Sequence, residues 1–146
     1  KEFNIQPVGL AARDSLRLEM GFCLYGNDID QTTNPLEAGL GWITKLSKAD
    51  FIAKDVLVKV KENGLNRKLV ALTSGEKIFP RHGYDITVNG KKIGVITSGT
   101  VSPMLDQPIA MGYVETKYAE IGSEVNFLIR GKEVPAKVVK LPFVKR

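Results

Sequence analysis

The chain has 146 residues, of which 43% are hydrophobic and 25% charged, a composition typical of one globular domain or of one domain with part of another. Its 21 basic and 16 acidic residues give a net charge of +5, which favours an anionic ligand or an acidic partner. The basic residues are spread along the chain without an arginine-rich arm, so we expect no nucleic acid as partner. No apolar run reaches the roughly 18 residues of a membrane helix, so we expect no membrane-spanning segment and no membrane as partner.

The first predicted element is a helix that starts after Gly9. Residues 10–20 contain good helix formers and no internal Gly or Pro, and Gly21 is the expected end. Residues 22–25 are a short apolar connector, and residues 26–30 have the composition of a turn.

This helix carries two arginines, Arg13 and Arg17, on one face among small and apolar residues. A guanidinium in such surroundings needs an anionic partner, because an unpaired buried charge is costly, and its planar fork binds a carboxylate at two points. The residues alone favour a structural ion pair with Asp14 or Glu19 over a bound ligand. If a ligand is bound, Arg13 is the candidate and Arg17 the structural residue.

The segment after the turn has few regular elements. Asn34 and Pro35 predict a capped turn of helix that ends before Gly39. Trp42 is predicted to be an anchor in the core or at a domain interface, since large aromatics mainly supply buried area. Residues 54–63 have the pattern of a helix with one apolar face.

Beyond residue 66 the pattern changes to short strands joined by glycine-containing turns. Two hairpins are predicted, around Asn89-Gly90 and around Arg130-Gly131-Lys132. The expected strands cover 67–73, 85–88, 92–97, 109–115, 125–129 and 133–141. We therefore predict a mixed α/β chain: a short helical segment at residues 1–48, too short to bury its own apolar surface, and a small antiparallel β-barrel domain at residues 49–146.

Few residues have the pattern of a catalytic or metal site. The single cysteine, Cys23, excludes an internal disulfide and predicts a reducing compartment, and the single histidine, His82, excludes a metal site with two histidines. The two residues could form a nucleophilic pair. We instead expect Cys23 to be a small buried hydrophobic residue, as a lone cysteine usually is, and His82 to be a solvated loop histidine. Asp28 and Asp30 match part of a calcium loop, but an ordinary turn explains them better. We therefore expect no metal ion.

Several long motifs resemble the aminomethyltransferases, the T-proteins of the glycine cleavage system. The first is GLAARDSLRLEMGFCLYGNDID at residues 9–30, followed by PLEAGLGW at residues 35–42. Further motifs lie along the rest of the chain: DFI at 50–52, KIG at 92–94, TSG at 97–99, SP at 102–103, IAMGYV at 109–114 and LPFV at 141–144. The resemblance covers essentially the whole chain.

The resemblance implies an enzyme that transfers a one-carbon unit from the aminomethyl-lipoyl arm of H-protein to tetrahydrofolate and releases ammonia. It implies that this chain is the C-terminal part of such an enzyme, with the catalytic Asp and the pterin-binding Glu in upstream sequence, and the lack of an initiator Met agrees with a fragment. No catalytic residue is then expected in this chain, and the family's folate-binding arginine falls on Arg13. The implied location is the cytoplasm, or the mitochondrion in a eukaryote.

Two alternatives stay open. A related folate-dependent demethylase shares the SLRLE-like motif, although the GNDID and AGLGW segments favour the glycine-cleavage member. The other alternative is a non-catalytic barrel that binds a partner, with Arg13 in a structural role. Binding of tetrahydrofolate distinguishes that barrel from the two folate enzymes.

Overall fold

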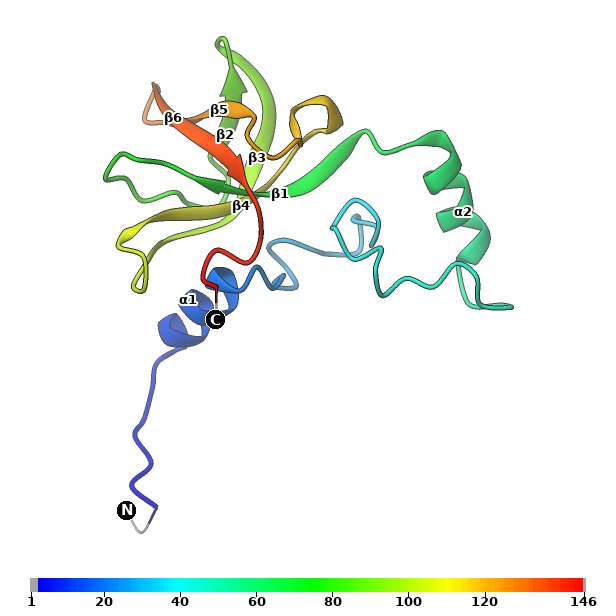
Figure 1. Cartoon of the computed structure of the whole chain (residues 1–146), viewed down its shortest axis with the longest axis horizontal. Helices are drawn as coiled ribbons and strands as arrows, with labels where there is room; N and C mark the ends of the chain where they lie inside the picture. The colour runs from blue at the N-terminus through cyan, green and yellow to red at the C-terminus, as the bar shows by residue number, and fades with distance from the viewer. Residues whose placement is uncertain (1–2, 146) are drawn as a thin grey trace.

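The computed structural model describes residues 3–145. Two α-helices lead into six strands (Figure 1). The elements are α1 (Leu10–Glu19), α2 (Lys54–Asn63), β1 (Arg67–Thr73), β2 (Asp85–Val88), β3 (Lys91–Ser102), β4 (Gln107–Glu115), the 3-10 turn η1 (Thr116–Tyr118), β5 (Glu124–Ile129) and β6 (Lys132–Val139).

The six strands form a closed antiparallel barrel in the order β1-β4-β3-β2-β5-β6, and β6 pairs back with β1. Closure satisfies the hydrogen-bonding groups at both edges of the sheet. The predicted fold class is therefore confirmed. Strand β3 extends past the predicted end at residue 97, because its second half pairs with the start of β4, from Gly99 opposite Ala110 to Ser102 opposite Gln107.

Both predicted hairpins are present. Asn89 and Gly90 have φ angles of 51° and 74°, and Arg130 and Gly131 have φ angles of 51° and 78°. Two successive left-handed residues are what a two-residue hairpin turn requires, since this geometry matches the twist of the flanking strands.

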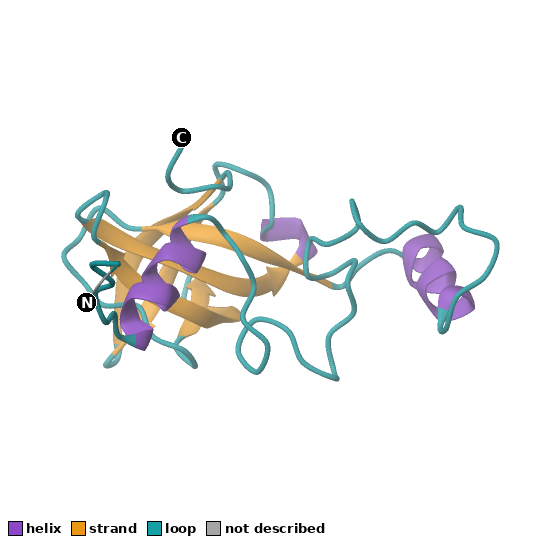
Figure 2. Cartoon of the chain, turned by 90° about the horizontal axis from the view of Figure 1, so that it is seen from below, coloured by secondary structure: helices purple, strands orange, loops and turns teal. Residues whose placement is uncertain are grey.

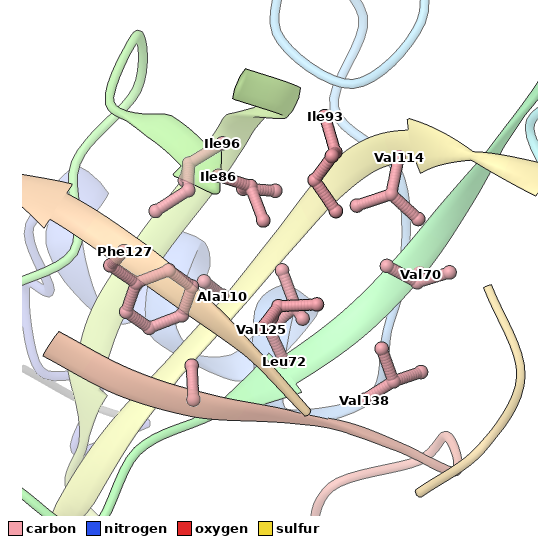
Figure 3. Packing of buried hydrophobic residues seen from close by; sticks show 11 residues of the cluster. Val70, Leu72, Ile86, Ile93, Ile96, Ala110, Val114, Val125, Phe127 and Val138 are labelled. Carbon is pink, nitrogen blue, oxygen red and sulfur yellow. The ribbon is translucent and has the colours of Figure 1, made fainter. Parts of the chain in front are cut away.

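The barrel interior holds the main hydrophobic core. Figure 3 shows side chains from several strands pointing toward one another, among them Leu72, Ile86, Ile96, Val114 and Phe127, all with no exposed surface. Each such side chain contributes about 1.5–3 kcal/mol relative to an exposed one. The core is therefore formed by the barrel itself and not by the helices.

Helix α1 packs on the outer face of strands β3 and β4, as Figures 1 and 2 show. A second cluster joins Leu18 of the helix to Ile109 and Met111 of β4, with Cys23 and Phe143 packed at its edge. Cys23 thus packs among hydrophobic side chains, as expected for a lone cysteine.

Helix α2 has the predicted bounds but stands away from the barrel in Figures 1 and 2, and none of its residues is buried. Trp42, in the loop before it, is 73% exposed. The prediction of Trp42 as a core residue is therefore wrong for the described residues. Its alternative role at a domain interface and the domain boundary at residue 48 stay predictions.

Candidate functional site

Helix α1 places its two arginines in different surroundings. Arg13 is exposed, whereas the Arg17 side chain is only 11% exposed and points to the barrel. The helix ends at a left-handed Gly21 (φ 73°), and the Phe22 amide donates to the Arg17 carbonyl at 2.8 Å, which closes the last turn. The expectation that the Arg13 guanidinium is half-buried among apolar residues is wrong for the described residues: Arg13 and its apolar neighbours Leu10 and Leu16 are exposed, and Leu18 is the apolar residue of α1 that is buried.

Arg17 bonds three separate parts of the chain. Its Nε donates to Asp14 Oδ1 at 2.7 Å, within the helix. Its Nη1 donates to Asp28 Oδ2 at 2.7 Å, and its Nη2 donates to Ser98 Oγ on β3 at 2.9 Å. The predicted ion pair with Asp14 is confirmed, and Arg17 also fixes the helix to the barrel.

Asp28 is the centre of this network and has no exposed surface. Its carboxylate also accepts hydrogen bonds from the Leu24 amide at 2.9 Å and from Thr97 Oγ1 at 2.5 Å. The Tyr113 hydroxyl donates to the Asp28 carbonyl at 2.9 Å. The prediction that residues 26–30 form a turn is confirmed for the backbone. It did not include the burial of the Asp28 carboxylate. The available signal was an acid in a turn soon after a helix with two arginines.

Glu19, the other carboxylate expected to pair with an arginine, instead accepts hydrogen bonds from Ser102 Oγ at 2.5 Å and from the Met104 amide at 3.2 Å. It is only 4% exposed. Its backbone carbonyl accepts from the Phe143 amide at 2.9 Å, so the segment after β6 is tied to the end of α1.

A second ion pair, between Arg67 and Glu37, connects the 34–38 turn to the barrel. Asn34 Oδ1 accepts from the Leu36 and Glu37 amides at 3.0 Å, which confirms the predicted cap. Arg67 Nε and Nη2 bind the two oxygens of Glu37 at 2.9 and 3.1 Å, and the guanidinium lies 4.6 Å from the centre of the Tyr113 ring. Burial opposes ionisation of Glu37, but the hydrogen bonds from Arg67 and Asn34 outweigh it and lower the pKa of this carboxyl.

Two potential nucleophiles near α1, the Cys23 thiol and the Tyr113 hydroxyl, are protonated at neutral pH. Burial and the charge of Asp28 raise the pKa of the Cys23 thiol. Burial, reinforced by the charge of Glu37, raises the pKa of Tyr113 to about 12. His82 is exposed and places Nδ1 2.8 Å from the Thr97 carbonyl, to which it donates. The site therefore offers binding groups and a rigid frame, and neither the Cys23 thiol nor the Tyr113 hydroxyl is activated as a nucleophile.

Within the same residues, no cluster of three His, Cys, Asp or Glu side chains has the arrangement of a metal site. Asp30, the second acid of the partial calcium loop, accepts from the Thr32 amide and hydroxyl at 2.7 Å. No helix in the described part of the chain has the length and hydropathy needed to cross a membrane.

The fold and site define a closed antiparallel barrel with a helix fixed to its outer face by a buried arginine–aspartate pair and presenting a second arginine outward. The family described as "Glycine cleavage T-protein C-terminal barrel domain" matches residues 67–145, and "GCVT N-terminal domain" matches residues 1–48. The chain belongs to the glycine cleavage T-protein family.

The relatives are named aminomethyltransferases. The protein of Flavobacterium psychrophilum is 56% identical over 147 residues, covering 100% of this chain and 41% of the relative, and that of Halothermothrix orenii is 52% identical, covering 98% and 40%. The crystal structure of glycine cleavage system aminomethyltransferase T from Bartonella henselae matches with a TM-score of 0.89 and 42% identity, covering 94% of this chain and 39% of that one. The chain thus spans about 40% of the length of the relatives it matches.

Proposed function

We propose that the chain is the C-terminal part of an aminomethyltransferase, which transfers a one-carbon unit from the aminomethyl-lipoyl arm of H-protein to tetrahydrofolate with release of ammonia. The observation that carries this proposal is the match of 94% of the chain, at a TM-score of 0.89, to the Bartonella henselae enzyme. The proposed location is the cytoplasm, which the free Cys23 and the bacterial origin of the relatives support.

In this proposal Arg13 binds the folate. Its guanidinium is exposed on a helix that Arg17 and Asp28 hold in place, so it can meet a ligand without reorganising the barrel. The glutamate tail of folate carries carboxylates, which arginine binds at two points. Transfer of this kind depends on positioning and proton handling, and in this proposal Arg13 contributes to positioning.

The catalytic aspartate and the pterin-binding glutamate are proposed to lie in the part of the relatives that this chain does not match. The 146-residue chain alone is then inactive, and it forms one wall of the folate site.

A direct test compares this chain with the longer protein that contains it. Both are supplied with aminomethylated H-protein and tetrahydrofolate, and ammonia release is measured. We expect activity from the longer protein only. Folate-dependent ammonia release by the 146-residue chain would contradict the proposed division of the site, and a longer protein that binds no tetrahydrofolate would support the non-catalytic barrel instead. Activity on an N-methyl amino acid without H-protein would favour the demethylase.

A further inference from the structure

A second candidate site lies between the 77–84 loop and the β5–β6 turn, where a cavity of about 390 Å³ is lined by three cationic side chains. These are Lys77, Arg81 and Arg130, and all three residues are exposed. The other lining residues are apolar or aromatic: Ile78, Phe79, Tyr84 and Ile129. No carboxylate is among the lining residues, and no residue of the network around α1 contributes to this cavity.

No ion pair within residues 3–145 neutralises the positive charge of the cavity. None of the ion pairs observed among residues 3–145 includes Lys77, Arg81 or Arg130. Asp85, which follows Tyr84, is already paired with Lys92 at 2.6 Å. Three like charges around one cavity repel one another, so an anion that enters it lowers their mutual repulsion.

The loop that carries Arg81 is held firmly against strand β3. Pro80 is fully buried, and Gly99 approaches it so closely that a Cβ there would lie 2.5 Å from the Pro80 carbonyl oxygen. The Gly83 amide donates to the Ile96 carbonyl at 2.8 Å, and the Tyr84 amide donates to the Arg81 carbonyl at 3.2 Å. The backbone of Arg81 is therefore fixed before any ligand binds, which lowers the entropic cost of binding.

Arg130 occupies a turn position that usually holds another residue type. It has φ 51°, the same value as Asn89 at the equivalent position of the other hairpin. Asn, Asp and Gly are favoured at such left-handed positions, and a long side chain is disfavoured. The arginine therefore breaks a local preference at a two-residue hairpin turn that borders the cationic cavity. Departures of this kind are expected where a side chain has a function.

We propose that this cavity binds a small molecule with an aromatic or apolar body and a carboxylate or phosphate group. The two guanidinium groups and Lys77 would hold the anion, since arginine forks match both carboxylate and phosphate oxygens. Phe79, which is 68% exposed, and Tyr84 would contact the body of the ligand. The volume lies in the range of roughly 300–1,000 Å³ of small-molecule sites. Arg13, the residue proposed above to bind folate, is not among the lining residues of this site.

The test is a titration of the ¹⁵N-labelled 146-residue chain with benzoate and with phenyl phosphate, followed by amide chemical shifts. Benzyl alcohol, which has the same ring without a charge, is the matched control ligand. We expect saturable shifts at residues 77–84 and 129–131 with at least one of the anions and none with the alcohol. The anion that binds more tightly identifies the carboxylate or the phosphate as the recognised group.

Two variants test the arginines. Arg130→Asn removes the charge but places a favoured residue in the turn, so the melting temperature should stay equal or rise while anion affinity falls roughly tenfold, the effect of one charge-assisted hydrogen bond. Arg81→Gln should weaken binding similarly. Lys91→Asn, which removes the same charge after the other hairpin turn, should leave affinity unchanged. Any of three results would overturn the proposal. The two arginine variants could bind the anion as tightly as the unmodified chain, the alcohol could bind as well as the anions, or neither anion could give a saturable shift.

Discussion

The Arg17 guanidinium lies 2.7 Å from the Asp28 carboxylate, which has no exposed surface. This pair joins α1 to the 22–30 segment, and the further bonds to Ser98 and Thr97 join both to strand β3. The orientation of α1 on the barrel therefore depends on a buried ionic network as well as on apolar packing. Arg13 lies one turn away on the same helix, so the network also fixes the position from which Arg13 can meet a ligand.

Substitution of Asp28 by Asn should destabilise the chain by about 3 kcal/mol, since it removes the buried one of the two carboxylates that neutralise a nearly buried guanidinium. Asp14→Asn is the matched control, because Asp14 also bonds Arg17 but its side chain is 50% exposed, and the expected loss is below about 1 kcal/mol. Urea unfolding of the three proteins measures both effects. Equal losses for the two variants would show that the buried pair has no special role.

Arg13→Ala tests the proposed folate contact. In the longer protein, we expect tetrahydrofolate binding to weaken by about 1–3 kcal/mol, the scale of a hydrogen bond to a charged group. The melting temperature should change little, because Arg13 is exposed. Calorimetric titration gives the affinity, and Lys132→Ala, at the β5–β6 turn, controls for the loss of one positive charge. Unchanged affinity in a folded Arg13→Ala protein would remove Arg13 from the site.

The barrel was predictable from the sequence because its signals are local. Asn89-Gly90 fixes a hairpin by backbone conformation alone, and the alternation of residues in the flanking strands sets which side faces the core. Arg130-Gly131 also predicts a hairpin turn, but less strongly, because arginine is less favoured than asparagine at the first turn position. Strand ends were less accurate, because the end of β3 depends on pairing with a strand that lies after the next turn.

The hydrogen-bond and ion-pair network around Arg17 and Asp28 was not predictable in the same way. The sequence predicts Asp28 as a turn residue, which is correct, but the burial of its carboxylate depends on contacts with Thr97 and Tyr113, which lie on strands distant in sequence. Glu37 likewise reaches Arg67 only in the folded barrel. The size of Trp42 predicts burial in a core or at a domain interface, and the first of these is wrong, because the residue is 73% exposed in the described chain.

Stability at acid pH should depend on Glu37. Its pKa is lowered in the folded chain, because the hydrogen bonds from Arg67 and Asn34 outweigh the effect of burial. Its contribution to the free energy of unfolding is thus complete above the ordinary value of 4.5 and is lost as the pH falls through the lowered pKa. Glu37→Gln should be less stable at neutral pH, with the difference shrinking below pH 4.5.

Urea unfolding at several pH values measures this difference, with Glu62→Gln, an exposed side chain on α2, as control. A difference between the Glu37→Gln and unmodified chains that is independent of pH would show that the carboxylate does not gain stability from ionisation.

A methyl group at Gly99 should be poorly tolerated. Its Cβ would lie 2.5 Å from the carbonyl oxygen of Pro80, and backbone atoms cannot move away easily. We expect Gly99→Ala to destabilise the barrel by about 3 kcal/mol, at the upper end of overpacking effects. Gly75→Ala is the control, because a Cβ there meets nothing within 4 Å. Thermal unfolding compares the two variants, and similar melting temperatures would mean that the 77–84 loop shifts readily.

Local stability should differ between the barrel and the segments before it. The barrel strands bury the main core, whereas Phe3, Ile5 and Val8 are each about 80% exposed and α2 buries no residue. We expect core amides of β3 and β4 to exchange only through global unfolding and amides of residues 3–9 and of α2 to exchange much faster. Helix α1 should be intermediate, because the Arg17–Asp28 pair ties it to the barrel, and Asp28→Asn should lower its protection selectively. Hydrogen exchange with residue resolution measures this order, and equal protection of α1, α2 and the barrel would contradict it.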